Sequence, residues 1–350
     1  MQFGSDNWAG ASEKVMAALV AANAGDVPAY GGDAITQRLE RRLADLFERE
    51  VGVLLVATGT AANSLAVTGL IPPYGAVICH RGAHLNTDEC GAPEFFGSNK
   101  LIALGGARGK VTSAGLKQLL DRRPRGVHHV VPALLSLTQS TELGSVYAVD
   151  EVAELAGLAH DKGLLVHMDG ARLGNALVHT GASLAEMTWQ AGVDILSFGA
   201  TKGGCLLAEA IVVFDLAQVE RLAFLRKRSG QLVSKHRILS AQFDAWLDGG
   251  HWLELASHAN AMAGRLAEGM LRSGRAQPAF QPEANEVFAF LADADAERLH
   301  AAGAQFYDWD ADILEPEEQP GRGEKLYRFV TSFRTLPEDV DRFLGLLAQG

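Results

Sequence analysis

Short apolar stretches alternate with amphipathic stretches along the first two thirds of the chain. The apolar stretches contain many β-branched residues and few polar interruptions, which is typical of strands buried on both faces of a sheet. The intervening stretch at 149–163 instead repeats apolar residues at helical spacing. This alternation predicts an α/β protein in which helices cover both faces of a mostly parallel sheet. We expect its strands at 51–57, 76–80, 100–105, 128–137, 164–169, 193–198 and 210–215.

The two ends of the chain follow different patterns. Residues 1–11 fit neither a strand nor a helix, and we expect them to form an arm, with helices following from near Ser12 and from about Asp33. After residue 240, long helical stretches lead into strand-like runs at 286–291 and 327–333. The pattern therefore predicts an arm, a large three-layer domain and a smaller α+β domain. Their expected bounds are 1–11, 12–240 and 241–350.

Composition narrows the class of protein. The chain has 350 residues, of which 48% are hydrophobic and 21% charged, as in a globular enzyme with more than one compact unit. Its formal charge of −11 disfavours binding to nucleic acid or to an anionic membrane, because neutralising phosphates needs a basic face. The N-terminus lacks the features of a signal peptide, and no apolar span is long enough for a membrane, so we expect a cytoplasmic protein. Three cysteines without CxxC spacing favour neither disulfides nor a metal site.

The segment DILSFGATKGG places Lys202 just after a predicted strand. Ligands of α/β proteins bind at strand ends, and a lysine that loses its proton there can attack a carbonyl to form an imine. Small neighbours, including Gly199 and Gly203, would leave room for a flat cofactor. The alternative is a solvated loop lysine with glycines for turning.

A second strand, in LLVHMDGARLGNA, ends at Asp169 and is followed by Arg172. A carboxylate at the end of an apolar strand needs a charged partner. The protonated ring nitrogen of pyridoxal phosphate would be such a partner, and Arg172 could bind a carboxylate with its planar fork. The alternative is that Asp169 and Arg172 pair with each other.

Two further segments carry candidate chemistry. The turn ATGTAAN offers backbone amides at a helix start and threonine hydroxyls, so Gly59 and Thr60 are candidate phosphate ligands, although the same residues could serve as an ordinary helix cap. The polar segment HRGAHLNTDECG contains His80 and His84, and an imidazole there could stack on a cofactor ring or transfer protons.

Taken together, FGSDN, YGGD, ATGTAAN, AHLNTDECG, HMDGAR and SFGATKGG resemble, in order and spacing, the low-specificity threonine aldolases. These belong to the β-eliminating lyase group of fold-type I pyridoxal-phosphate enzymes. The resemblance covers nearly the whole chain. It implies a homodimer or a homotetramer with active sites shared between subunits, and cleavage of L-threonine, L-allo-threonine and related β-hydroxy-α-amino acids such as phenylserine to glycine and an aldehyde.

The resemblance also implies roles for single residues. Lys202 would form the Schiff base, Asp169 would hold the pyridine nitrogen, His84 would stack on the ring, and Gly59 and Thr60 would bind phosphate. The remaining residues would bind substrate or complete the cofactor site from a neighbouring subunit. Ser5, Arg172 and Arg328 match positions for the substrate carboxylate, Tyr30 lies in a subunit-interface motif, and Lys235 is a candidate for a neighbour's phosphate.

One position departs from the family. Many relatives have a Glu-Asn-Thr-His pattern after the strand that here reads LLSLTQSTELG, and its histidine contacts the β-hydroxyl of the substrate. The nearest position here is Thr141. Threonine is a poor base, so the proton acceptor is left open, with His84 or a bound water as alternatives. The basic segment at 226–235 could equally be a solvated helix end. Other reactions of the same cofactor, namely β-elimination, transamination and racemisation, stay open, as do a cofactor-binding regulator and a silent paralogue.

Overall fold

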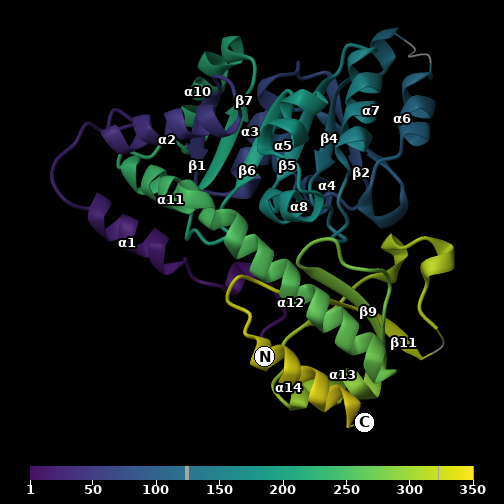
Figure 1. Ribbon diagram of the computed structural model, residues 1–350. Coiled ribbons are helices and arrows are strands. Elements are labelled where there is room, and N and C mark those ends of the chain that lie inside the picture. The colour runs from purple at the N-terminus through teal and green to yellow at the C-terminus, as the bar shows by residue number, and fades with distance from the viewer. Residues whose placement is uncertain (123–125, 322, 350) are drawn as a thin grey trace.

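The larger part of the molecule is built on a seven-stranded sheet with the strand order β1-β7-β6-β5-β4-β2-β3 (Figure 1). The computed structural model describes residues 1–122, 126–321 and 323–349. Every predicted strand of this part is present, with ends that differ by a few residues. The strands are β1 (Gly52–Val56), β2 (Gly75–His80), β3 (Lys100–Leu104), β4 (Val131–Thr138), β5 (Leu165–Gly170), β6 (Ile195–Gly199) and β7 (Glu209–Val213).

The sheet is mostly parallel, as predicted, but β7 runs opposite to both of its neighbours, β1 and β6. The pairs from β6 through β5, β4 and β2 to β3 are parallel. A parallel strand after β6 would need a crossover of a dozen or more residues, usually a helix. Only residues 200–208 join β6 to β7, so the chain must reverse direction there. This short reversal contains Lys202 and holds it at the edge of the sheet.

Helices cover both faces of this sheet. Helices α3 and α10 pack on one face, where Leu54 and Val56 point, whereas α2, α7, α8 and α11 pack on the other, where Leu55 points. Among the described residues, no helix is both long enough and apolar enough to cross a membrane. The helices are α1 (Glu13–Ala22), α2 (Ala34–Leu46), α3 (Gly59–Gly69), α4 (His84–Thr87), α5 (Ala92–Gly97), α6 (Ser113–Leu120), α7 (Val149–His160), α8 (Leu173–Thr180), α9 (Leu184–Met187), α10 (Val219–Arg228) and α11 (Arg237–Leu247).

Side-chain caps fix the starts of several of these helices. Thr58 accepts a hydrogen bond from the backbone N–H of Ala61 at the start of α3, and Asp33 accepts one from Thr36 at the start of α2. Such caps satisfy one of the N–H groups that a helix start leaves without a partner. The cap at Thr58 sets the first turn of α3 directly after β1, where the sequence predicts an anion site.

The smaller part consists of an antiparallel sheet with the order β10-β11-β9-β8 and three helices. The long helix α12 leads into it from the larger part, as Figure 1 shows. The expected strands at 286–291 and 327–333 correspond to β9 and β11. The elements are α12 (His251–Ser273), β8 (Ala276–Pro278), β9 (Glu286–Ala292), α13 (Asp293–Ala301), β10 (Tyr307–Asp308), β11 (Glu324–Val330) and α14 (Pro337–Ala348).

The N-terminal arm is anchored in the smaller part. Phe3 is fully buried in its core and forms backbone hydrogen bonds with Gln305 and Val330, each 2.8 Å long. The arm then runs past the ends of the large sheet towards α1. Asp6 in this arm bonds to Arg172, just after β5, and to Asn285, just before β9, so the arm links the two sheets.

Candidate active site

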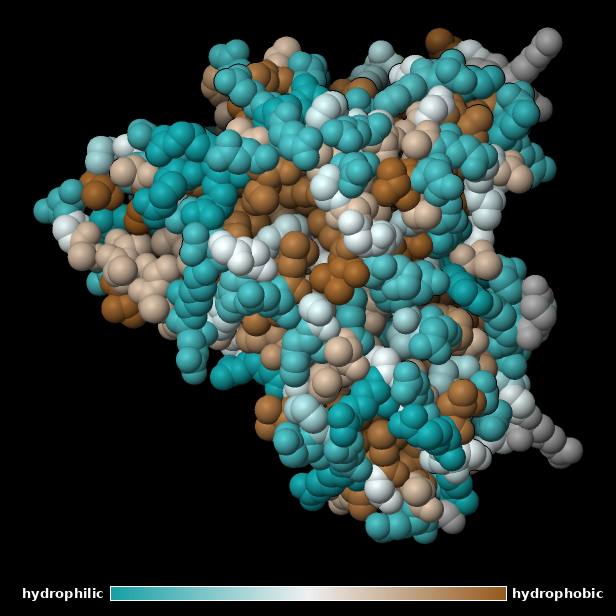
Figure 2. Space-filling view, viewed as in Figure 1, coloured by the Kyte–Doolittle hydropathy of each residue, from teal (hydrophilic) through white to brown (hydrophobic). Residues whose placement is uncertain are grey.

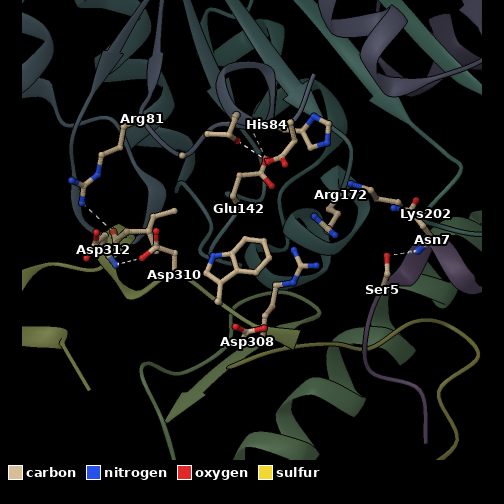
Figure 3. A pocket seen from close by; sticks show the side chains of 16 residues that line it. Ser5, Asn7, Arg81, His84, Glu142, Arg172, Lys202, Asp308, Asp310 and Asp312 are labelled. Carbon is tan, nitrogen blue, oxygen red and sulfur yellow. Dashed lines mark hydrogen bonds between the residues drawn. The ribbon is translucent and has the colours of Figure 1, made fainter. Parts of the chain in front are cut away.

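Two adjoining cavities lie where the parallel strands of the large sheet end. The inner cavity has a volume of about 280 Å³ and the outer one about 790 Å³. Figure 3 shows the outer cavity, with His84 and Glu142 near its middle and Lys202 and Arg172 to one side. The residues that line both cavities are Asn7, His84, Glu142 and Lys202.

Lys202 lies in the short reversal between β6 and β7, and its loop is held by packing. The indole N–H of Trp246 donates to the carbonyl of Gly203 at 2.9 Å, and the N–H of Ser12 donates to the carbonyl of Gly204, also at 2.9 Å. Lys202 is only partly exposed and lines both cavities. It is therefore a residue of the pocket and not a solvated loop lysine.

Asp169 lies at the end of β5 with only 3% of its surface exposed. One carboxylate oxygen accepts the N–H of Ala171 at 3.0 Å, and the other accepts the side-chain amide of Asn63 at 2.8 Å. The alternative pairing with Arg172 is not formed, and no other described basic side chain forms an ion pair with Asp169. A buried carboxylate facing a cavity in this way fits a cationic ring nitrogen.

The first turn of α3 forms another wall of the inner cavity. Gly59 and Thr60 line it, and their N–H groups belong to the helix start, where intrahelical acceptors are lacking. A Cβ built on Gly59 would meet nothing within 4 Å, so the space above this turn is open. Amides around an open space at a helix start fit a phosphate group. Together with Lys202 and Asp169, the residues present fit pyridoxal phosphate.

His84 is tied to a buried carboxylate. Its Nδ1 lies 2.9 Å from an oxygen of Glu89, which also accepts the side-chain amide of Asn63 at 2.8 Å. The hydrogen bond to Glu89 raises the pKa of His84 despite partial burial. His80 instead bonds to Gly106 and Gly82 and lines neither cavity, so the choice of His84 between the two histidines agrees with the geometry.

Arg172 is buried in an ion pair with the N-terminal arm. Its Nε lies 2.7 Å and its Nη2 3.1 Å from the carboxylate oxygens of Asp6, whereas Nη1 lies 3.5 Å from Glu286. Burial alone would raise the pKa of Asp6, but the charges of Arg172 and Lys202 outweigh it and bring the pKa to about 2. Arg328 stacks over Trp309 at 4.1 Å, and its Nε is buried without a hydrogen-bond partner.

The structure does not bring three of the predicted residues to these cavities. Thr141 is fully buried and lines neither of them, although we expected it near the substrate. Tyr30 and Lys235 lie on the surface outside both cavities, close to each other, since the N–H of Tyr30 donates to the carbonyl of Ser234 at 3.0 Å. Ser5, in contrast, lines the outer cavity as predicted.

Several residues of the site were not identified from the sequence. Asp6, Asn63 and Glu89 complete the bonding of predicted residues, and Glu142 and Glu209 line the inner cavity. Glu209 could have been identified from the sequence, because it is a charged residue at the start of an apolar strand, as Asp169 is at the end of one. The others stand in loops or a helix where no periodicity distinguishes them.

Behind the cavity, a buried histidine links two strands. The ring of His167 on β5 lies 2.9 Å from the hydroxyl of Ser136 on β4 and 2.9 Å from that of Ser197 on β6. Burial lowers the pKa of His167 to about 4, so the ring is neutral at pH 7. Ser197 lines the inner cavity, and this bonding fixes the orientation of its hydroxyl.

Glu209 on β7 makes the stability of the fold depend on pH. Burial raises its pKa to about 7, although hydrogen bonds from Thr201 and Ala200 and the charge of Lys202 oppose this. In the unfolded chain the carboxyl ionises near its ordinary value, so its burial costs nothing below that value. As pH rises from that value to about 7, the unfolded chain ionises while the folded state keeps the proton, so stability is progressively lost, and the loss is complete above about 7.

We therefore expect Glu209→Gln to stabilise the cofactor-free protein at alkaline but not at acidic pH. The gain over the wild type should approach about 3 kcal/mol at about pH 8 and nearly vanish at about pH 4, because one pKa unit corresponds to about 1.4 kcal/mol. Urea unfolding across this range measures it. Glu154→Gln, a change at an exposed site on α7, is the control. A gain that does not vary with pH would contradict this account of Glu209.

Comparison with known proteins identifies the family of the chain. The profile of the family described as "Beta-eliminating lyase" matches residues 2–294. The chain belongs to the β-eliminating lyase family. Two relatives within it are named "Low specificity L-threonine aldolase". The protein of Pseudomonas aeruginosa is 41% identical over 325 residues, which cover 89% of this chain and 94% of the relative. That of Pseudomonas sp. (strain NCIMB 10558) is 41% identical over 307 residues, covering 87% and 88%.

Two solved structures show the same fold. The threonine aldolase of Leishmania major superposes with a TM-score of 0.91 at 27% identity, covering 99% of this chain and 98% of the other. The serine palmitoyltransferase of Sphingomonas wittichii shares the fold with a TM-score of 0.72 at 17% identity, covering 100% and 86%. The resemblance predicted from the sequence motifs and the predicted fold class are both confirmed.

Proposed function

We propose that the protein is a pyridoxal-phosphate-dependent aldolase. It would cleave L-threonine, L-allo-threonine and related β-hydroxy-α-amino acids, such as phenylserine, to glycine and an aldehyde. The observation that carries this proposal is the convergence of Lys202, Asp169 and the first turn of α3 on one cavity. Relatives that are 41% identical over most of the chain carry the name of this activity.

Each end of the cofactor has a matching group in the inner cavity. Lys202 would bind the aldehyde carbon as an imine, Asp169 would hold the proton on the ring nitrogen, and Gly59 and Thr60 would bind the phosphate. His84, fixed by Glu89, would lie against the ring. When bound, pyridoxal phosphate supplies an electron sink for the bond that breaks.

The substrate would enter through the outer cavity, where two arginines can bind its carboxylate. Arg328 lines the outer cavity and lies 4.0 Å from Glu286, whereas the fork of Arg172 is occupied by Asp6 at 2.7 Å. We therefore assign the main carboxylate contact to Arg328, with Ser5 beside it and Arg172 supplying positive charge from its ion pairs with Asp6 and Glu286. Holding the carboxylate fixes which bond at Cα stands perpendicular to the ring, and this orientation selects the reaction.

We also propose that the protein works as a homodimer or a homotetramer in the cytoplasm. Tyr30 and Lys235 are exposed and line neither cavity of this subunit, so we assign them to the site of a neighbouring subunit. The exposed apolar residues Val20 on α1 and Ile238 on α11 support self-association. On the face shown in Figure 2, apolar side chains lie open near the middle and polar ones surround them.

The decisive assay adds L-threonine, D-threonine, L-phenylserine, L-serine and L-alanine separately to the purified holoenzyme. Aldehyde together with glycine from the L-β-hydroxy substrates is the expected result. Pyruvate from L-serine would indicate β-elimination, a keto acid from L-alanine would indicate transamination, and an inverted product would indicate racemisation. Bound cofactor without any turnover would instead support a regulator or a silent paralogue. Any of these four results in place of aldehyde release would overturn the proposal.

A further inference from the structure

The reaction needs a group that accepts the proton of the substrate's β-hydroxyl, and the cavities restrict the choice. The bond between Cα and Cβ breaks where the cofactor, proposed for the inner cavity, meets the substrate, proposed for the outer one, so the base should line both. Only Asn7, His84, Glu142 and Lys202, among the described residues, line both cavities. Asn7 is no base, and Lys202 is the proposed site of cofactor attachment. The choice is thus between His84 and Glu142.

Thr141, which we expected near the β-hydroxyl of the substrate, is unable to take this role. Its hydroxyl donates to the carbonyl of Arg108 at 2.9 Å and accepts the N–H groups of Leu143 and Ser145 at 3.3 and 3.2 Å. The side chain is fully buried and turned away from both cavities. The loop after β4 therefore presents Glu142, the next residue, to the pocket.

One ring nitrogen of His84 is already bonded. Its Nδ1 bonds to Glu89 at 2.9 Å, and this bond raises the pKa of the ring and so favours the form that already carries both protons. In that form the ring only donates, so a carboxylate with a free oxygen is the better proton acceptor.

Glu142, in contrast, has a carboxylate oxygen that is free to accept a proton. Oε1 accepts the backbone N–H of His84 at 3.3 Å, which positions the carboxylate, whereas Oε2 receives no hydrogen bond from the described residues. The charge of Glu142 contributes to the raised pKa values of both His84 and Arg172. The Glu142 side chain therefore lies close to both of these residues. Figure 3 shows it beside His84, facing the open space.

We propose that Glu142 is the catalytic base that accepts the β-hydroxyl proton, an inference that rests on the proposed aldolase function. The O–H bond breaks as its proton passes to Oε2, the oxygen forms a C=O bond to Cβ, and the electron pair of the Cα–Cβ bond passes to the electron sink. A proton is then added at Cα to give glycine, and Glu142 releases its own proton to solvent through the outer cavity. One proton is lost and one gained, so no oxidant or reductant is needed.

The test compares two reactions of the holoenzyme, of which only one needs this base. Cleavage of L-threonine requires loss of the hydroxyl proton, whereas exchange of the α-proton of glycine with deuterium uses the same cofactor and carboxylate site but has no hydroxyl. Glu142→Gln should lower kcat for cleavage by about 10² to 10⁴-fold. The same variant should keep the exchange rate, measured by NMR, and the cofactor absorbance within about threefold of the wild type.

Two further variants separate the role of a base from general electrostatics. Glu142→Asp keeps the carboxylate but shortens its reach, so it should recover part of the lost activity. Asp88→Asn removes a carboxylate that lines only the outer cavity, and it should cleave L-threonine like the wild type. The fall in kcat of the wild type at low pH, as the base becomes protonated, should be absent in Glu142→Gln.

Several results would overturn the assignment. If the Glu142→Gln variant cleaved L-threonine at the wild-type rate, a bound water or His84 would be the group that accepts the proton. An equal loss of cleavage and of glycine exchange would mean that Glu142 only positions other groups. If Asp88→Asn lost as much cleavage activity as Glu142→Gln, both carboxylates would act only through their negative charge. A wild-type enzyme that exchanges glycine but does not cleave L-threonine would instead refute the proposed function and would be recognised before any variant is compared.

Discussion

Replacing Lys202 by alanine is expected to abolish both the Schiff-base absorbance and the turnover of L-threonine. The amine at this position is the proposed point of covalent attachment, and no other lysine lines either cavity among the described residues. Loss of a covalent catalytic group removes the path by which substrate replaces protein on the cofactor, so we expect kcat to fall by roughly 10⁴-fold or more. Absorbance spectroscopy and a coupled aldehyde assay on the purified variant measure the two effects.

A matched control is available for this variant. Lys162 lies on the surface in an ion pair with Asp121 at 3.2 Å and is far from the site in the fold. Lys162→Ala should retain both the absorbance and the activity, because exposed ion pairs of this kind contribute little to stability. Normal cleavage by Lys202→Ala would refute the assignment of the lysine, and with it the mechanism described above.

Asp169→Asn is expected to reduce kcat by about 10² to 10³-fold, the range found when a preorganised polar group facing developing charge is removed. The change keeps the size of the side chain but removes the negative charge that would hold the proton on the ring nitrogen. The new amide would also face a donor, because Ala171 and Asn63 each donate to one carboxylate oxygen. Loss of one such bond in a buried site costs about 1 to 3 kcal/mol.

Measurements of kcat, of cofactor affinity and of the folded fraction separate these two effects. Asn63→Ala serves as the comparison, since it removes a donor to Asp169 while leaving the charge in place. We expect this variant to lose less activity than Asp169→Asn. If Asp169→Asn bound the cofactor and cleaved L-threonine at the wild-type rate, the carboxylate would have only a structural role.

The sequence predicts the parts of the site that follow strands. Lys202 and Asp169 each come directly after or at the end of a buried apolar run, and the ends of parallel strands meet at one edge of a sheet. The direction of β7 was not predicted, because a buried strand has the same apolar sequence pattern whether it is parallel or antiparallel to its neighbours. The length of the loop before it was the signal that could have indicated the reversal.

The sequence does not reveal contacts between distant segments. Arg172 pairs with Asp6, 166 positions away, and nothing local to either residue indicates this partner. In the loop after β4, the motif places Thr141 at the substrate, but backbone geometry buries it and exposes Glu142 to the pocket instead. Which of two neighbouring loop residues faces a cavity is decided by the turn and by packing around it, and these are tertiary properties.

The ion pair between Asp6 and Arg172 has a consequence for how the protein matures. Because Arg172 also faces Glu286 and the arm is anchored beside Val330, the binding pocket unites the first residues of the chain with some of the last. A nascent chain cannot complete it until residues as far as Val330 have been synthesised. A cofactor that binds only the completed pocket adds its binding free energy to the stability of that state. The yellow colour of the bound coenzyme would then report, during refolding, the fraction of chains in which both sheets have docked.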